Sequence, residues 1–168
     1  MKKGLDVVKI RLVKEDCLYE NDFVTSKSDA VEVMKKELAD YDREVFCILN
    51  LKTRGEVINM NIVSQGTWNA SIVSPREVFK SSILSNAAGI IALHNHPSGN
   101  IKPSREDYET TKRLKECGDL LDIPLIDHVI VAAGGRKVYS FKEHDELDIG
   151  EKGYVKEPEI DYDEEMEI

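Results

Sequence analysis

Two uninterrupted apolar runs constrain the fold of this chain more than any other feature. VFCILNL fills residues 45–51, and AAGIIALH fills residues 87–94. Runs of this length, without polar alternation, are typical of strands that are covered on both faces. We therefore predict two buried strands, with 87–94 in the centre of a sheet and other elements packed on both sides of it.

The segments around these runs are predicted as further strands and amphipathic helices. Helices are expected over 28–41 with Ser28 as cap, over 75–86 after a Ser74-Pro75 start, and over 104–121 with Ser104 as cap. Strands are expected over 5–14, 56–64, 126–132 and 137–141. Because strands and helices alternate along the chain, we predict an α/β domain with a mixed sheet and helices covering its faces.

The net negative charge of the chain comes from its C-terminal residues. The whole chain has a net charge of −9, and residues 141–168 hold twelve Asp/Glu and three Lys, which is also −9. We predict an N-terminal strand and connection packing on the domain over 1–27, one domain over 28–141, and an acidic tail over 142–168 that is disordered or docks. The neutral body offers no positive field for phosphates, so direct non-specific nucleic-acid binding is not expected.

The cysteine pattern and the apolar segments predict a reduced, cytoplasmic protein. Cys17, Cys47 and Cys117 are an odd and widely spaced set without a Cys-x-x-Cys pair, and no secretory signal is visible. We expect Cys47 and Cys117 to be core thiols. The longest apolar stretch, 87–93, is far below membrane-spanning length, so no membrane association is expected.

The chemistry-bearing residues follow the central strand. His94 and His96 are two positions apart in an extended segment, so both imidazoles point to the same side and can bind one ion. Asp107 lies in the first turn of the next predicted helix. Its helical stripe continues as Thr111, Leu114, Gly118 and Leu121. A carboxylate on this inward stripe is costly unless it is paired or bound to a cation.

This ligand set predicts one catalytic zinc ion. Two histidines and one aspartate leave a fourth tetrahedral position for water, and zinc lowers the pKa of such a water to about 7. Glu44, at the start of the strand 45–51, is the predicted base that takes the water proton and passes it to the leaving amine. Ser104, three residues before Asp107, is the predicted donor to the oxyanion.

The order Glu44, His94-x-His96, seven residues, Ser104, two residues, Asp107 resembles the JAMM motif of MPN/JAB-domain metalloproteases. DREVFCILNL, HNHPSGNIKPSRED and LIDHVIV make the segment from about Ser28 to Phe141 similar to the bacterial RadC-like branch. The resemblance implies a three-layer α/β/α fold similar to cytidine deaminases, one zinc ion, and hydrolysis of a peptide or isopeptide bond in a protein or peptide substrate. It also implies the same five residue roles.

Several alternatives accompany this interpretation. Glu56 competes with Glu44 as the acid/base, but Glu44 is preferred because the family glutamate stands where a helix meets the first core strand. A nucleobase deaminase is disfavoured because H-x-E and P-C-x-x-C are absent. The letters HNH do not make a nuclease, because the HNH residues of nucleases are not normally adjacent.

A binding module that acts in DNA metabolism or repair with little or no turnover is the remaining functional alternative. Longer RadC-like proteins carry an N-terminal helix-hairpin-helix region, and this chain begins almost directly in the domain, which weakens a DNA role. Asp127 and His128 suggest an outer contact to a metal ligand. We favour the reading that they are strand residues with local hydrogen bonds.

Overall fold

The structure is a computed structural model that describes residues 11–15, 27–66 and 73–147. Within these ranges the chain alternates helices and strands as predicted. The helices are α1 (Lys27–Ala39), α2 (Pro75–Leu84) and α3 (Arg105–Leu120). The strands are β1 (Val45–Leu51), β2 (Val57–Gln65), β3 (Gly89–His96), β4 (Leu125–Ala132) and β5 (Val138–Ser140).

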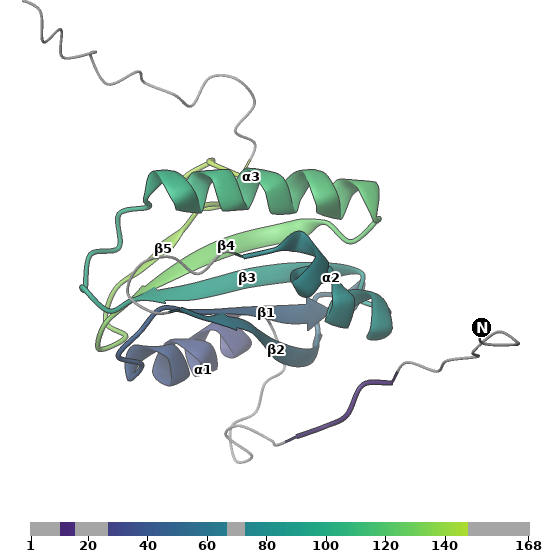
Figure 1. Cartoon of the computed structure of the whole chain (residues 1–168), viewed down its shortest axis with the longest axis horizontal. Helices are drawn as coiled ribbons and strands as arrows, with labels where there is room; N and C mark the ends of the chain where they lie inside the picture. Colours follow the sequence, from purple (N-terminus) through teal and green to yellow (C-terminus); the bar gives the residue numbers. More distant parts are fainter. Residues whose placement is uncertain (1–10, 16–26, 67–72, 148–168) are drawn as a thin grey trace, which may run out of the picture.

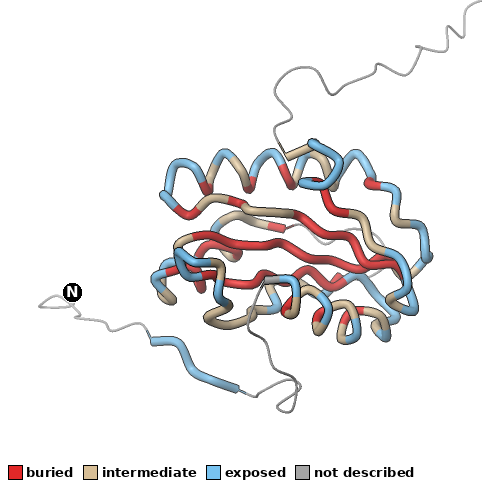
Figure 2. Tube along the Cα trace, turned by 180° about the vertical axis from the view of Figure 1, so that it is seen from behind, coloured by how far each residue is buried: buried red, intermediate tan, exposed pale blue. Residues whose placement is uncertain are grey.

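The described strands form one mixed sheet in the order β2-β1-β3-β4-β5. β3 pairs antiparallel with β1 and parallel with β4, while β2 and β5 pair antiparallel with their neighbours. Every residue of β1 and β3 is buried, and Figure 2 shows the central strands buried along their length. The predicted mixed sheet and the central position of 87–94 are therefore confirmed.

Helices cover both faces of the sheet, which makes three layers. α1 packs its Ala30, Met34 and Leu38, spaced four residues apart, on the odd-numbered side chains of the central strands. α2 and α3 pack on the opposite face, where Leu114 of α3 joins the even-numbered side chains. Figure 1 shows α1 and α3 on opposite sides of the sheet. The alternation in β3 thus sends His94 and His96 to the α2/α3 face.

The structure corrects some predicted boundaries. β3 continues through His96, so both histidines belong to the strand itself. α1 begins at Lys27, so Ser28 lies inside the first turn and is not the cap. Leu121, predicted on the inward stripe of α3, is 41% exposed because the helix has ended there. Residues 11–15 are exposed and belong to no strand, and residues 5–10 of the predicted N-terminal strand lie outside the described residues.

The first residues of the predicted tail contact the domain. The Glu146 carboxylate accepts hydrogen bonds from the hydroxyls of Tyr108 and Tyr139 at 2.8 and 2.5 Å. Leu147 packs on the apolar cluster of the α2/α3 face. The rest of the tail, 148–168, lies outside the described residues. Among the described helices, none is both long enough and apolar enough to cross a membrane.

Candidate metal centre

The two predicted histidine ligands stand side by side at the end of β3. His94 Nε2 and His96 Nε2 are 3.0 Å apart, and both side chains are almost fully buried. Their shared direction follows from the two-residue period of the strand. His94 also lies opposite Phe46 of β1, and the two rings stack with centroids 5.9 Å apart. The strand and this aromatic contact together orient the first ligand.

Asp107 reaches the histidines because of the way α3 begins. Ser104 is the N-cap and Asp107 the third helical residue of a capping box, so each side chain binds the other's backbone N–H. The Asp107 carboxylate accepts from Ser104 N–H and from Ser104 Oγ, both at 2.7 Å. This local motif holds the Asp107 carboxylate at the N-terminus of α3, facing the end of β3.

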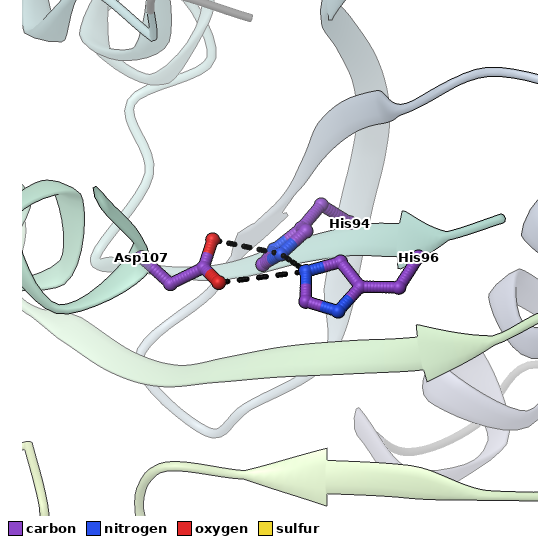
Figure 3. A group of neighbouring side chains, drawn as sticks. All are labelled: His94, His96 and Asp107. Atoms are coloured by element: carbon purple, nitrogen blue, oxygen red, sulfur yellow. Dashed lines mark hydrogen bonds and ion pairs between the residues drawn. The ribbon is translucent and has the colours of Figure 1, made fainter. Parts of the chain in front are cut away.

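The carboxylate meets both imidazoles, as Figure 3 shows. Asp107 Oδ1 is 3.0 Å from His94 Nε2, and Oδ2 is 3.4 Å from His96 Nε2. The three potential ligand atoms lie within 4.8 Å of one another, so the structure positions His94, His96 and Asp107 to bind a metal ion. The predicted convergence of these three residues is therefore observed.

The protonation pattern of the centre favours a cation. His96 Nδ1 is 2.6 Å from the carbonyl oxygen of Asn100, which can only accept, so this nitrogen carries the ring proton. The Nε2 lone pair of the neutral ring then points at His94 and Asp107. The Nε2 lone pairs and the carboxylate oxygens of Asp107 repel one another unless a proton or a metal ion lies between them. Two imidazole nitrogens and one carboxylate oxygen are donors that zinc accepts.

In the absence of a metal ion, a proton on a histidine Nε2 takes its place and stabilises the ionised form of Asp107. Burial opposes its ionisation, but the hydrogen bonds with His94 and His96 outweigh burial and hold the pKa of Asp107 well below its usual range. Burial alone would lower the pKa of His96. The hydrogen bond with Asp107, the bond to the Asn100 carbonyl and the charges of Asp107 and Glu44 outweigh it, so the His96 pKa is raised.

Glu44 lies at the same end of the sheet as the histidines. Phe46 pairs with His94, and Glu44 is two residues before Phe46, so the strand alternation places it on the face that carries His94 and His96. Its side chain is exposed. Its backbone carbonyl accepts from Gly66 N–H at 2.8 Å. The role of Glu44 as the base stays a prediction.

Glu56 lies at the opposite end of the sheet. It immediately precedes Val57, which pairs with Leu51, and Leu51 pairs with Gly89 at the start of β3. The seven residue-to-residue steps from Gly89 to His96 correspond to roughly 23 Å of strand. Glu56 also forms an exposed ion pair with Lys52 at 3.0 Å. The strand register therefore separates Glu56 from the candidate site.

The comparison with protein families agrees with the geometry. A sequence model of the RadC-like JAB domain matches residues 24–147. The chain belongs to the RadC-like JAB domain family. It is 40% identical over 157 residues to a UPF0758 protein of Staphylococcus haemolyticus. The aligned residues cover 88% of this chain and 68% of that protein.

Two further UPF0758 proteins are similar to this RadC-like domain. The protein of Rubrobacter xylanophilus is 44% identical over 121 residues, which cover 72% of this chain and 52% of that protein. The protein of a Geobacillus species is 43% identical over 132 residues, which cover 79% and 54%. The chain thus spans about half to two thirds of the length of these relatives, whose names state no reaction.

Ser104 of the RadC-like domain contacts the centre through Asp107. Its hydroxyl donates to Asp107 Oδ2 and accepts from Asp107 N–H at 3.1 Å. The hydroxyl therefore orients the carboxylate ligand in this structure. The oxyanion role predicted for Ser104 requires the same exposed hydroxyl to turn toward a substrate, and it stays a prediction.

Two further residues support the site, and the first of them, Asn95, was missed from the sequence. Asn95 points to the α1 side, where its Oδ1 accepts from Val45 N–H at 2.7 Å and its Nδ2 donates to the Arg43 carbonyl at 2.9 Å. These bonds hold the backbone on both sides of Glu44. A polar residue between two ligands, in an otherwise apolar strand, was the available signal.

His128 is the second supporting residue, and it makes the outer contact to a candidate ligand that the sequence suggested but did not favour. Its Nε2 lies 2.8 Å from His94 Nδ1, on the side of the ring that faces away from Asp107. Burial, followed by the charge of His94, holds the pKa of His128 well below its ordinary value. The prediction of a strand residue with local hydrogen bonds fits Asp127. Its carboxylate accepts hydrogen bonds from the Ser140 hydroxyl and from the backbone N–H groups of His128 and Lys142.

Proposed function

We propose that this RadC-like domain is a zinc-dependent hydrolase of the JAMM type that cleaves a peptide or isopeptide bond. The convergence of His94 Nε2, His96 Nε2 and the Asp107 carboxylate, at the sheet end where Glu44 also lies, carries the proposal. Two imidazoles and one carboxylate are a ligand set of catalytic zinc, with one position left for water. The resemblance to JAB-domain metalloproteases supports the same reaction class.

Each residue of the site has a separate role in the proposed hydrolysis. His94, His96 and Asp107 would hold the zinc ion, which when bound would lower the pKa of the attacking water to about 7. Glu44 accepts the proton of the attacking water and passes it to the leaving nitrogen. A bond forms between the water oxygen and the carbonyl carbon, the C–N bond breaks, and the amine leaves with that proton. The Ser104 hydroxyl donates to the carbonyl oxygen as negative charge develops on it.

The edge of the sheet offers a path for an extended protein or peptide substrate. β2 is an outer strand of the described sheet, and its last residue, Gln65, pairs with Val45. Within the described residues, the outer edge of β2 therefore ends next to Glu44. A peptide added along this edge by main-chain hydrogen bonds would bring a carbonyl to the centre.

The decisive experiment compares two glutamate variants. Purified wild-type protein is analysed for zinc by elemental mass spectrometry and assayed on a panel of peptides and isopeptide-linked conjugates. Glu44→Gln is expected to retain zinc, with about one ion per chain, and to lose hydrolysis. Glu56→Gln is the matched control, because Glu56 lies at the far end of the sheet, and it should retain both zinc and activity.

Two outcomes would contradict the proposal. Wild-type protein that does not bind zinc would remove the metal centre, and a Glu44→Gln variant that cleaves as fast as wild type would remove the assigned base. Protein that binds zinc and cleaves nothing in the panel would favour the alternative, an accessory binding module with little or no turnover.

A further inference from the structure

A chain of hydrogen bonds runs from His94 through the core to α3. His94 Nδ1 is 2.8 Å from His128 Nε2, and His128 Nδ1 is 2.6 Å from Thr111 Oγ1. The Thr111 hydroxyl in turn donates to the backbone carbonyl of Asp107 at 2.6 Å. His128 and Thr111 are completely buried, and His94 is 5% exposed. The chain therefore links one candidate ligand to the backbone of another without contact with solvent.

The protons in this chain can be assigned from its far end. A backbone carbonyl only accepts, so Thr111 donates its single proton to Asp107 O. Thr111 Oγ1 must then accept from His128, which places the proton of that ring on Nδ1. A fully buried imidazole is neutral because burial disfavours charge. His128 Nε2 therefore carries a lone pair and accepts from His94 Nδ1–H.

The consequence for His94 is a defined tautomer. With the proton on Nδ1, the lone pair of His94 Nε2 points at His96 and Asp107, which is the form that binds a metal ion. Without these hydrogen bonds, a neutral His94 could equally carry its proton on Nε2. That form cannot bind a metal ion through Nε2.

Packing holds the His128 ring in the orientation that the chain requires. The ring stacks on Phe141 with centroids 5.0 Å apart and planes 8° apart. Phe46 contacts it edge-on at 5.5 Å and also stacks on His94. The two aromatic side chains fix the plane of the ring, and within that plane its nitrogens lie beside His94 and Thr111.

We propose that His128 and Thr111 are positioning residues of the metal centre, which hold His94 in its Nδ1–H tautomer and tie its orientation to the first turn of α3. Neither residue is expected to touch the metal or the substrate. The inference rests on the proposed function only in requiring that the centre binds zinc. Groups of this kind, behind a histidine ligand, commonly change metal affinity 10- to 100-fold when removed.

The test uses Thr111→Val, which removes the hydroxyl and keeps the shape of the side chain. Zinc affinity is measured by competition with a chromophoric chelator. We expect Thr111→Val to bind zinc about 10- to 100-fold more weakly than wild type, and Thr111→Ser, which restores the hydroxyl, to bind close to wild type. Thr110→Val makes the same change at the neighbouring, half-buried position of α3 and should leave the affinity unchanged.

A second measurement separates positioning from a loss of packing. In metal-free protein, ¹⁵N NMR of the imidazoles should show His128 with its proton on Nδ1 in wild type. In Thr111→Val we expect the proton on Nε2, since Nδ1 has lost its acceptor and Nε2 can donate to His94 Nδ1. Zinc binding then requires this tautomer to reverse, which explains the weaker affinity. A purely structural role of Thr111 would leave the tautomer of His128 unchanged.

The outcomes distinguish this inference from the proposed function. Folded Thr111→Val that binds zinc as tightly as wild type would overturn the inference and leave the hydrolase proposal intact. Wild-type protein without zinc affinity would overturn both. If Thr111→Val does not fold, His128→Gln and His128→Leu replace it. The glutamine oxygen can accept from His94 Nδ1–H and should preserve more zinc affinity than leucine, and equal affinities would overturn the inference.

Discussion

Asn95→Ala removes the side chain that joins the end of β3 to the segment before β1. In the native protein, Asn95 Oδ1 accepts from Val45 N–H and Nδ2 donates to the carbonyl of Arg43. These two residues flank Glu44, so the substitution releases the backbone that positions the proposed base. The histidine ligands point to the other face of the sheet and keep their own contacts.

The expected loss of stability follows from the two backbone groups that lose their partner. Val45 is completely buried, so water cannot reach its N–H, and an unpaired buried donor costs about 1–3 kcal/mol. Arg43 is exposed, so its carbonyl can bind water instead, and this second bond contributes roughly 0.5–1.5 kcal/mol. We therefore expect Asn95→Ala to lower the free energy of unfolding by about 1.5–4.5 kcal/mol, which corresponds to a Tm lower by on the order of 10 °C.

The assay is urea denaturation followed by circular dichroism, with zinc content and hydrolysis measured on the same protein. Asn61→Ala, the same change at a half-buried position of β2, is the control. Under the proposed function, Asn95→Ala should bind zinc and hydrolyse more slowly, because Glu44 is no longer held. A change in unfolding free energy within about 0.5 kcal/mol of wild type, the range of ordinary surface substitutions, would refute the reasoning.

Three further predictions concern packing, thiol chemistry and metal linkage. Gly118→Ala should destabilise the protein by about 1–3 kcal/mol in thermal unfolding, although alanine favours a helix, because its Cβ would lie 2.6 Å from the carbonyl oxygen of Ile123. Burial and then the charge of Glu37 raise the pKa of Cys47 to about 12, so its thiol stays protonated at pH 8. Peptide mass spectrometry should therefore find Cys47 unmodified by iodoacetamide in native protein and modified in urea. Zinc at 100 times its dissociation constant should raise the unfolding free energy by about 2.7 kcal/mol, and a chelator should reverse this increase; an unchanged Tm would contradict zinc binding to the native state.

The sequence alone determined the parts of this protein that depend on local physics. The apolar run at 87–94 predicted a central buried strand, and the two-residue period of that strand predicted that His94 and His96 share a side. The spacing of Ser104 and Asp107 placed both in the first turn of α3, where the capping box forms. These inferences succeeded because the interacting groups are at most three residues apart.

The tertiary structure decided which distant residues join the ligands. The antiparallel register of Phe46 with His94 puts Glu44 at the end of the sheet that carries the histidines and leaves Glu56 at the far end. The parallel register of Ala92 with His128 puts the buried imidazole behind His94. Strand order and register depend on contacts between residues far apart in the chain, and periodicity within one segment carries no information about its neighbour. For that reason the candidate metal ligands were visible in the sequence, while the contacts of Asn95 and His128 became visible only in the fold.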